Sequence, residues 1–289
     1  MGKSIVRLMS HNIWNRDYNS PEWEANGNDC SAAVRVKGLL RVYRETVPDI
    51  IGCQEASALM ADLLKSGFAN EAVDYTLIWG RYTPILYRAD KFELLDSAFF
   101  AYPERIEGFE GSFNDVGSKA FNIGVFREKQ SGKTFKFSTT HLWWMTSPGD
   151  EVFAGGSFYQ EHSNEAREFQ MAMLIDRLEA IREKYNCPAV LVGDMNTDYN
   201  SKALQYALSH GYRHAHDIAT DFAEESIGYH NCFPWGFDTE YSSKPFKAAI
   251  DHILVTGEKE GAVKRFERYS PDYYFPISDH SPAYIDFEL

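Results

Sequence analysis

The stretch Pro188-Ala189-Val190-Leu191-Val192-Gly193-Asp194-Met195-Asn196 joins an apolar, strand-like run to a polar signature. Its short apolar run, bounded by proline and glycine, predicts a buried β-strand. Gly193 lets the backbone come close to a neighbour, and the strand presents a carboxylate and an amide, Asp194 and Asn196, at its end. The same residue types also form the Asx turns that commonly join a strand to a helix.

Five further polar signatures follow strand-like apolar runs in the same way. They are Ser10-His11-Asn12, Gln54-Glu55, Thr140-His141-Leu142, Ile250-Asp251-His252 and Ser278-Asp279-His280. Carboxylate and amide oxygens suit a hard divalent cation, and histidine supplies proton transfer or a donor to developing negative charge. Because strand ends meet at a shared rim on a rigid scaffold, signatures distant in the sequence are expected to converge on one site.

The hydrophobic periodicity predicts more strands than helices. Four helices are expected: over residues 33–47, from Ser57 to near Gly67, a long helix after Gln160 with apolar residues up to Tyr185 on one face, and from Ser201 to Gly211. Strands are expected over 5–13, 49–53, 75–79, 84–88, 92–95, 121–127, 135–142, 188–192, 249–255, 263–269 and 283–287, with irregular structure over 212–247. Because helices interrupt the strands in two places, this order predicts an α/β protein with two packed sheets and helices on the outer faces. No Pro/Gly/Ser-rich linker divides the 289 residues, so one domain over 1–289 is expected, with two tightly fused halves as the alternative.

The composition limits the classes of partner. The formal net charge is −13, from 29 Lys and Arg against 42 Asp and Glu, and such a surface disfavours nucleic acid unless a basic patch or bound metal offsets it. No apolar run approaches the roughly 20 residues of a membrane span. No signal peptide is recognisable, so a cytoplasmic protein is expected, although a secreted protein cloned without its signal would read the same. The four cysteines form no C-x-x-C pair, and the sequence leaves the oligomeric state open.

Taken together, the motifs resemble the endonuclease/exonuclease/phosphatase superfamily of metal-dependent hydrolases. The resemblance runs in family order from Asn12 to His280, and Pro48-Asp49-Ile50-Ile51 and Thr83-Pro84-Ile85-Leu86-Tyr87-Arg88 are similar to the single-domain bacterial members. It implies a four-layered α/β sandwich of the DNase I type, with two packed, mainly antiparallel sheets flanked by helices. That expectation agrees with the strand and helix pattern.

The resemblance also implies a metal site for Mg²⁺, or Mn²⁺ in its place. Glu55 matches the family's metal ligand, Asn12 matches the amide that shares the metal or its water, and Asp279 matches an acid near the metal. Each has a structural alternative when taken singly. A glutamate after a strand forms salt bridges, and an asparagine there is usually a turn residue.

The catalytic roles come from the same resemblance. Asp194 and Asn196 match the pair that positions the attacking water and contacts the phosphate, and His141 matches a donor to the phosphoryl oxygen. His280 matches the general acid/base histidine and Asp251 the carboxylate that orients it. A single buried, hydrogen-bonded histidine would by itself indicate only a structural role.

Four features are weaker. His252 should point away from the site by strand alternation, Arg167 is interpreted as part of a surface or structural ion pair, and His214 and His216 as loop histidines. The aromatic residues of the segment from 143 to 160 could form a substrate platform or simply pack that segment down; they are Trp143, Trp144, Phe153, Phe158 and Tyr159. We assign Trp143 and Trp144 to substrate contact.

The sequence therefore predicts a divalent-metal-dependent hydrolase of phosphate esters. The acidic charge and the aromatic segment favour a phosphodiesterase or phosphatase acting on a small organic phosphate or a lipid headgroup. The alternative is an endo- or exonuclease on single-stranded or short nucleic acid, where stacking aromatics replace a basic groove. A third hypothesis, a catalytically inactive scaffold of the same fold, is disfavoured because all the key residue types are present.

Overall fold

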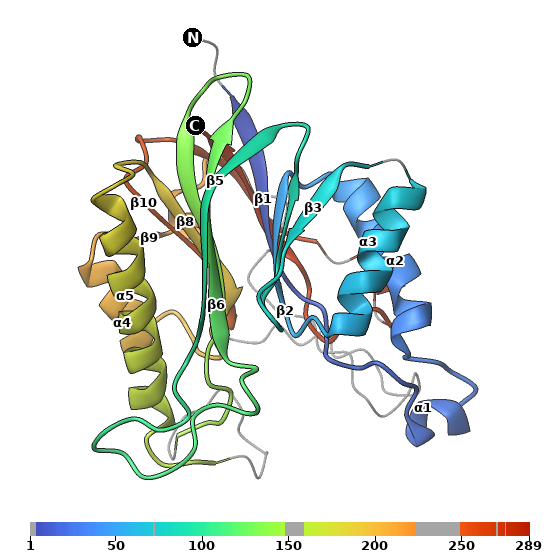
Figure 1. Cartoon of the computed structure of the whole chain (residues 1–289). Helices are drawn as coiled ribbons and strands as arrows, with labels where there is room; N and C mark the ends of the chain where they lie inside the picture. The colour runs from blue at the N-terminus through green and yellow to red at the C-terminus, as the bar shows by residue number, and fades with distance from the viewer. Residues whose placement is uncertain (1–3, 72, 148–158, 223–248, 270, 275) are drawn as a thin grey trace.

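Two six-stranded sheets form the centre of the protein in a computed structural model that describes residues 4–71, 73–147, 159–222, 249–269, 271–274 and 276–289 (Figure 1). The first sheet has the order β11 (Val263–Arg268), β12 (Ala283–Glu288), β1 (Ile5–Asn12), β2 (Ile50–Gln54), β4 (Ile85–Arg88) and β3 (Tyr75–Ile78). The second has the order β5 (Phe92–Ala101), β6 (Ala120–Glu128), β7 (Thr134–His141), β8 (Ala189–Asp194), β10 (Asp251–Thr256) and β9 (Arg213–His214).

Each sheet contains one parallel pair, β1–β2 and β7–β8, and its other pairs are antiparallel. The helices are α1 (Pro21–Ala25), α2 (Ala32–Thr46), α3 (Ala58–Asn70), α4 (Ser163–Arg182), α5 (Lys202–Ser209) and α6 (Ala215–Ile218), with a short 3₁₀ turn η1 (Asp272–Tyr274). Both predictions, two mainly antiparallel packed sheets and flanking helices, are confirmed. Within the described part of the chain, no helix has the length and apolar character that crossing a membrane requires.

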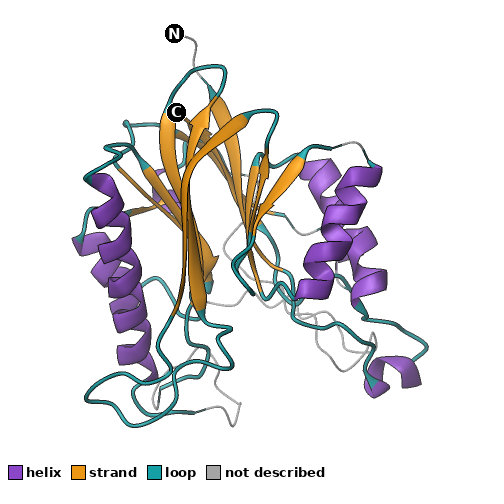
Figure 2. Ribbon diagram, in the orientation of Figure 1, coloured by secondary structure: helices purple, strands orange, loops and turns teal. Residues whose placement is uncertain are grey.

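The two sheets lie between flanking helices (Figure 2), and three separate apolar clusters hold these layers together. The inner faces of the two sheets pack on each other through residues such as Leu8, Phe137 and Val192. α2 and α3 cover the outer face of the first sheet, and α4 and α5 cover that of the second. Strands buried on both faces read as continuous apolar runs, which explains why the 188–192 pattern was recognisable.

Helix starts agree with the sequence, but the ends of α3 and α4 differ, and α4 ends at Arg182 instead of Tyr185. Ser57 and Ser201 accept hydrogen bonds from the backbone N–H groups of Met60 and Leu204, as N-caps do. α3 continues to Asn70, so the prediction that it closes near Gly67 was wrong. Gly67 is a packing residue, because a Cβ there would lie 2.3 Å from Leu40 Cδ1 of α2.

The other differences lie in the second sheet. β5 is longer than the predicted 92–95 strand, and the register shifts between Leu94 and Asp96. A bulge of this kind breaks the apolar alternation without ending the strand. Part of the region predicted as irregular, 212–247, contains β9 and α6, and residues 223–248 lie outside the described chain.

Strand register brings the polar signatures to one edge. Asn12 pairs with Gln54 at the ends of β1 and β2, and His141 pairs with Asp194 at the ends of β7 and β8. Asp251 also pairs with Asp194, but it begins β10 and does not end it. The prediction that every signature follows a strand was therefore wrong for Asp251, and for Ser278–His280, which precede β12. Antiparallel pairing with β8 nonetheless places the start of β10 at the shared edge.

Candidate active site

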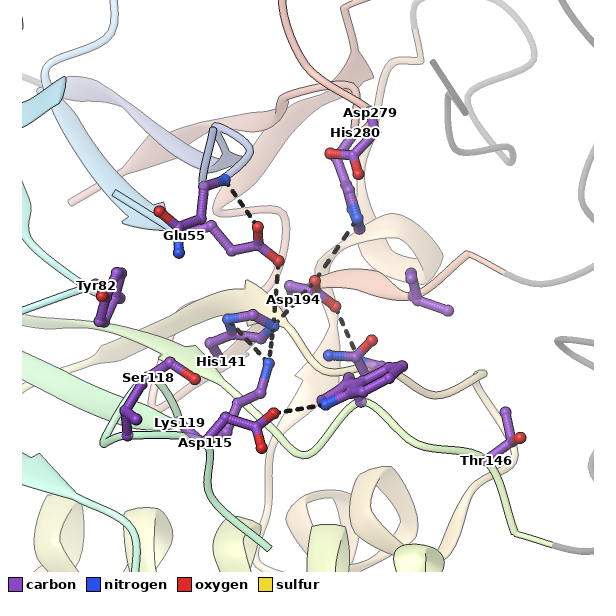
Figure 3. A pocket seen from close by; sticks show the side chains of 15 residues that line it. Glu55, Tyr82, Asp115, Ser118, Lys119, His141, Thr146, Asp194, Asp279 and His280 are labelled. Atoms are coloured by element: carbon purple, nitrogen blue, oxygen red, sulfur yellow. Dashed lines mark hydrogen bonds and ion pairs between the residues drawn. The ribbon is translucent and has the colours of Figure 1, made fainter. Parts of the chain in front are cut away.

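A cavity of about 500 Å³ opens where these strand ends meet (Figure 3). Most of the predicted site residues line it: Glu55, His141, Asp194, Asn196, Asp279 and His280. Asn12 and Asp251 lie directly behind, hydrogen-bonded to Asp194 and His280 respectively. The lining also includes residues that the sequence did not predict for the site: Asn15, Tyr82, Asp115, Val116, Ser118, Lys119 and Thr146.

Asp194 is the hub of the site. Its Oδ2 accepts a hydrogen bond from Asn12 Nδ2 at 2.8 Å, and its Oδ1 accepts one from the backbone N–H of Asn196 at 3.0 Å. The second bond forms the Asx turn that the sequence analysis gave as the structural alternative for Asp194. Asp194 therefore both shapes this turn and faces the cavity. Gly193 is required beside it, because a Cβ there would lie 2.2 Å from the carbonyl oxygen of Thr140.

Glu55 reaches the cavity from the residue after β2. Its φ of 58° lies in the left-handed region, which is uncommon for a glutamate and is often found at functional sites. The carboxylate Oε2 accepts the backbone N–H of Asn15 at 2.9 Å, and Oε1 lies 3.4 Å from Asn12 Nδ2. The side chain is therefore oriented toward Asp194 from the opposite sheet.

His280 and Asp251 form a buried pair, with Nδ1 2.7 Å from Oδ2. Burial opposes the charge on His280, but the carboxylates of Asp251, Asp194 and Asp279 outweigh it and hold the pKa of His280 well above its usual value. Burial alone would raise the pKa of Asp251, yet the charge and hydrogen bond of His280 keep that pKa below its ordinary value. Nδ1–H thus donates to the carboxylate, and Nε2 points toward Asp194 Oδ2, 3.8 Å away.

Lys119 lies against His141 and is the main residue that sequence reasoning missed. Its Nζ is 2.6 Å from His141 Nε2. Burial, together with the charges of Lys119 and His280, holds the pKa of His141 well below its usual value, so the ring is neutral and accepts a hydrogen bond from the ammonium. His141 Nε2 lies 3.4 Å from Asp194 Oδ2 and 3.9 Å from Glu55 Oε1. Because the ring is neutral, it forms no ion pair with either carboxylate.

A buried arginine, Arg35, connects two segments that carry site residues. Arg35 is 2% exposed and donates to five backbone carbonyls, those of Ile13, Trp14, Arg16, Cys30 and Ile277. It thereby joins the segment after β1 to the segment that carries Asp279 and His280. No motif pointed to it, because an arginine within a helix normally indicates a solvated face.

Replacing Arg35 by lysine is expected to destabilise the fold by about 2–4 kcal/mol, because one ammonium cannot serve five carbonyls and buried acceptors are left unpaired. Urea unfolding measures this as a lower midpoint. Arg41→Lys, on the exposed side of the same helix, is the matched control and should stay within about 0.5 kcal/mol of the wild type. Equal midpoints for all three proteins would contradict the structural role.

His11 completes a directional chain of hydrogen bonds behind His280. Tyr274 donates to the carbonyl oxygen of His280 at 2.6 Å, so its hydroxyl oxygen must accept from His11 Nε2, also at 2.6 Å. His11 Nδ1 then accepts from the hydroxyl of Tyr43 at 3.0 Å. Burial lowers the pKa of His11 to about 3, so the ring is neutral and this tautomer is fixed.

The weaker sequence features have structural explanations. His252 Nε2 lies 2.7 Å from the carbonyl oxygen of Thr197, away from the cavity as expected. Arg167 is buried, so it is not part of a surface ion pair; among its contacts within the described residues, it donates to the carbonyls of Trp143 and Met145 and to Asn164 Oδ1. His214 is a buried residue of β9 packed on Tyr199, with ring centroids 4.3 Å apart, and lines no part of the cavity.

The aromatic residues after β7 divide into two groups. Trp143 is 2% exposed, packs against Phe113 and does not line the cavity. In this structure it therefore has no exposed surface with which to make the substrate contact that the sequence analysis had assigned to it. Trp144 does line it, and its Nε1 donates to Asp115 Oδ2 at 2.8 Å. Tyr159 is exposed. Phe153 and Phe158 lie outside the described residues.

The donor set fits a hard divalent cation. Burial is the largest cause that raises the pKa of Asp194 to about 7 and of Asp279 to about 6, and Glu55 adds repulsion to both. Asp279 Oδ1 is buried and has no hydrogen-bond partner among the described residues. Ligand atoms of Glu55, His141 and Asp194 lie within 4.8 Å of one another. A cation would relieve this excess of negative charge, and oxygen-rich donors favour Mg²⁺ or Mn²⁺.

Two packed mixed sheets, with carboxylates, amides and an Asp–His pair gathered around one cavity, define the DNase I-like class of proteins. The chain belongs to the Endonuclease/Exonuclease/phosphatase family, whose family model matches residues 9–280. Members of this family are phosphoester hydrolases. The comparison with curated proteins found no match.

Solved structures share the whole fold. An endonuclease/exonuclease/phosphatase family protein from Bacteroides thetaiotaomicron superposes with a TM-score of 0.72 at 21% identity, over 100% of this chain and 99% of that one. A mannosyl-6-phosphatase of Bacteroides thetaiotaomicron gives 0.70 at 22% identity, over 97% and 98%. TDP2 of D. rerio, complexed with single-strand DNA product, gives 0.64 at 16% identity, over 99% and 100%.

Proposed function

We propose that this chain is a divalent-metal-dependent hydrolase of phosphate esters that acts on a small organic phosphate or a lipid headgroup. The observation that carries the proposal is the convergence on Asp194. Asn12 from the first sheet bonds its Oδ2, Glu55 lies beside them, and the His280–Asp251 pair faces it across one cavity. Such an arrangement of acid, base and oxygen ligands is what in-line hydrolysis of a phosphoryl group requires.

The proposed metal ligands lie on the Glu55 side of the cavity. Glu55, with Asn12 and Asp279 nearby, would hold Mg²⁺ or Mn²⁺, which when bound polarises a phosphoryl oxygen and stabilises the leaving group. Asp279 has the unsatisfied buried oxygen that such a ligand set would engage. We infer that residues 1–289 form one domain that carries this activity.

The remaining side chains act on water, charge and protons. Asp194 orients the attacking water, and Asn196 donates to the phosphoryl oxygens. The sequence assigned a second donor role to His141, but the neutral ring accepts from Lys119, so the ammonium presents N–H groups and His141 orients it. His280, held by Asp251, transfers the proton through Nε2.

Two relatives bear on the substrate. A mannosyl-6-phosphatase and TDP2 with single-strand DNA product share the fold, so both monoester and diester chemistry occur on it. The described lining residues include four carboxylates, Glu55, Asp115, Asp194 and Asp279, against the single lysine Lys119. This balance supports a small ester over the nuclease alternative, because a nucleic-acid chain needs cationic contacts along its backbone.

A substrate panel with added Mg²⁺ tests the reaction class. We expect turnover of p-nitrophenyl phosphate or bis-p-nitrophenyl phosphate, and of at least one small phosphate ester, measured as released nitrophenol or inorganic phosphate. Inositol phosphates, a phospholipid, and single- and double-stranded DNA complete the panel. Preferred cleavage of single-stranded DNA would support the nuclease alternative, and no turnover of any substrate would support the inactive scaffold.

A further inference from the structure

A tight turn at the mouth of the cavity has no role in the chemistry described above. Asp115, Val116 and Ser118 all line the cavity, and the backbone N–H of Ser118 bonds the carbonyl of Asp115 at 2.7 Å (Figure 3). Asn114 anchors the turn by donating to the carbonyls of Tyr102 and Lys119, at 2.7 and 2.9 Å. The turn is therefore a fixed rim joined directly to Lys119.

Trp144 is hydrogen-bonded to this rim. Its indole is partly exposed in the cavity, and Nε1 donates to Asp115 Oδ2 at 2.8 Å. Among the described residues, Oδ1 of the same carboxylate accepts no hydrogen bond. The rim thus combines an oriented aromatic face with an adjacent carboxylate oxygen that is available to a donor.

Val116 is the most exposed large apolar residue of the rim, at 88% exposure, and it has a φ of 45°. A β-branched residue in the left-handed region is strained, and solvent exposure gives it no compensating packing. Strain of this kind persists mainly at functional positions. Val116 lines the same cavity as Trp144 and offers apolar contact area there.

The floor of the cavity carries a positive charge, and its rim carries a negative one. Lys119 Nζ lies at the floor beside His141, where it can meet a phosphoryl group. The rim carries the Asp115 carboxylate and the hydroxyls of Ser118 and Tyr82. A second phosphate at the rim would face a carboxylate, whereas an uncharged group with hydroxyls would find acceptors and an aromatic face.

We propose, resting on the hydrolase function above, that the substrate is the phosphate monoester of a polyhydroxylated ring, a sugar phosphate. The C–H face of the ring packs on Trp144, and its hydroxyls donate to Asp115. The oxygen of the attacking water bonds to phosphorus as the ester P–O bond breaks. One proton passes to the leaving sugar oxygen, so the products are the free sugar and inorganic phosphate. The volume of about 500 Å³ is in the range of small-molecule sites.

Steady-state release of inorganic phosphate from glucose 6-phosphate, ribose 5-phosphate, fructose 1,6-bisphosphate and AMP tests this substrate class. We expect a sugar monophosphate to have the highest kcat/KM, by about tenfold or more over the bisphosphate. Trp144→Ala should raise KM for the sugar monophosphate about tenfold with kcat within about twofold.

Asp115→Asn removes only the rim charge, so the ratio of kcat/KM for monophosphate over bisphosphate should fall several-fold toward one. This ratio is measured within one protein and does not depend on how much of it folds. Asp62→Asn, on the exposed side of α3, is the matched control and should leave the ratio unchanged. An unchanged ratio in Asp115→Asn, or a preference for AMP, DNA or phospholipid, would overturn the sugar proposal while leaving the hydrolase intact. Failure to hydrolyse any ester would overturn the proposed function itself.

Discussion

Replacing His280 by alanine is expected to lower kcat for p-nitrophenyl phosphate by about 10²–10⁴, the usual scale for a general acid or base. The imidazole side chain is 11% exposed, and its Nε2 is the part that faces Asp194 and the cavity. Alanine leaves no group there that can transfer a proton. Steady-state kinetics at saturating Mg²⁺ measure the loss, and His210→Ala, at an exposed helix end, is the control.

The partner Asp251 should act through His280. Asp251→Asn keeps the size of the side chain but removes the charge that supports the imidazolium, so kcat should fall in the same direction. If the two residues work as a unit, the double variant costs far less in activation free energy than the sum of the two single variants. Additive losses would show that they act independently, whatever their 2.7 Å contact.

The same pair predicts a shift in titration. Burial lowers the pKa of His280, and the carboxylates of Asp251, Asp194 and Asp279 raise it well above its usual value. The stabilisation that the imidazolium gives the fold is therefore complete at low pH and lost as pH rises through that raised pKa. Asp251→Asn removes one of the raising charges, so the pKa of His280 measured by NMR in the metal-free protein should fall. A pKa unchanged by the substitution would contradict the pairing.

The fold was predictable because its central strands are buried on both faces and end in polar residues. The 188–192 and 49–53 runs have this pattern, and parallel pairing alone then aligns Asn12 with Gln54 and His141 with Asp194. Lys119 was missed because it precedes a strand, where a lysine normally reads as solvated. The signal that could have found it is the β6–β7 hairpin, whose register pairs Ala120 with His141 and so places Lys119 beside that ring.

The segment after β7 shows why irregular regions resist prediction from sequence. Trp143 and Trp144 are adjacent and chemically identical, yet one is enclosed by Phe113 and the other faces the cavity. No periodicity distinguishes them, because neither belongs to a helix or strand. Arg167 decides the outcome by bonding the carbonyls of Trp143 and Met145, a long-range contact that no local pattern encodes. Gly67 is a similar case, since its packing partner Leu40 lies on another helix.

Removing divalent cations is expected to abolish hydrolysis, and Glu55→Gln should lower metal affinity on the order of 100-fold. The amide preserves the shape of the side chain and its contact with the Asn15 N–H, but it removes the charge that attracts a cation. Mn²⁺ binding by isothermal titration calorimetry measures the affinity directly. Activity should vanish in EDTA and return with Mg²⁺ or Mn²⁺, and raising Mg²⁺ should recover part of the activity of Glu55→Gln.

Glu93→Gln provides the matched control, because Glu93 is an exposed strand residue far from the cavity lining, paired with Arg127. Its metal affinity should equal that of the wild type. Full activity after exhaustive chelation would contradict metal dependence altogether. Unchanged Mn²⁺ affinity in Glu55→Gln would instead move the primary ligands to Asp279 and Asp194, whose pKa values, raised to about 6 and about 7, mark them as the next carboxylates in need of a cation. Asp279→Asn would then show the 100-fold loss expected here for Glu55.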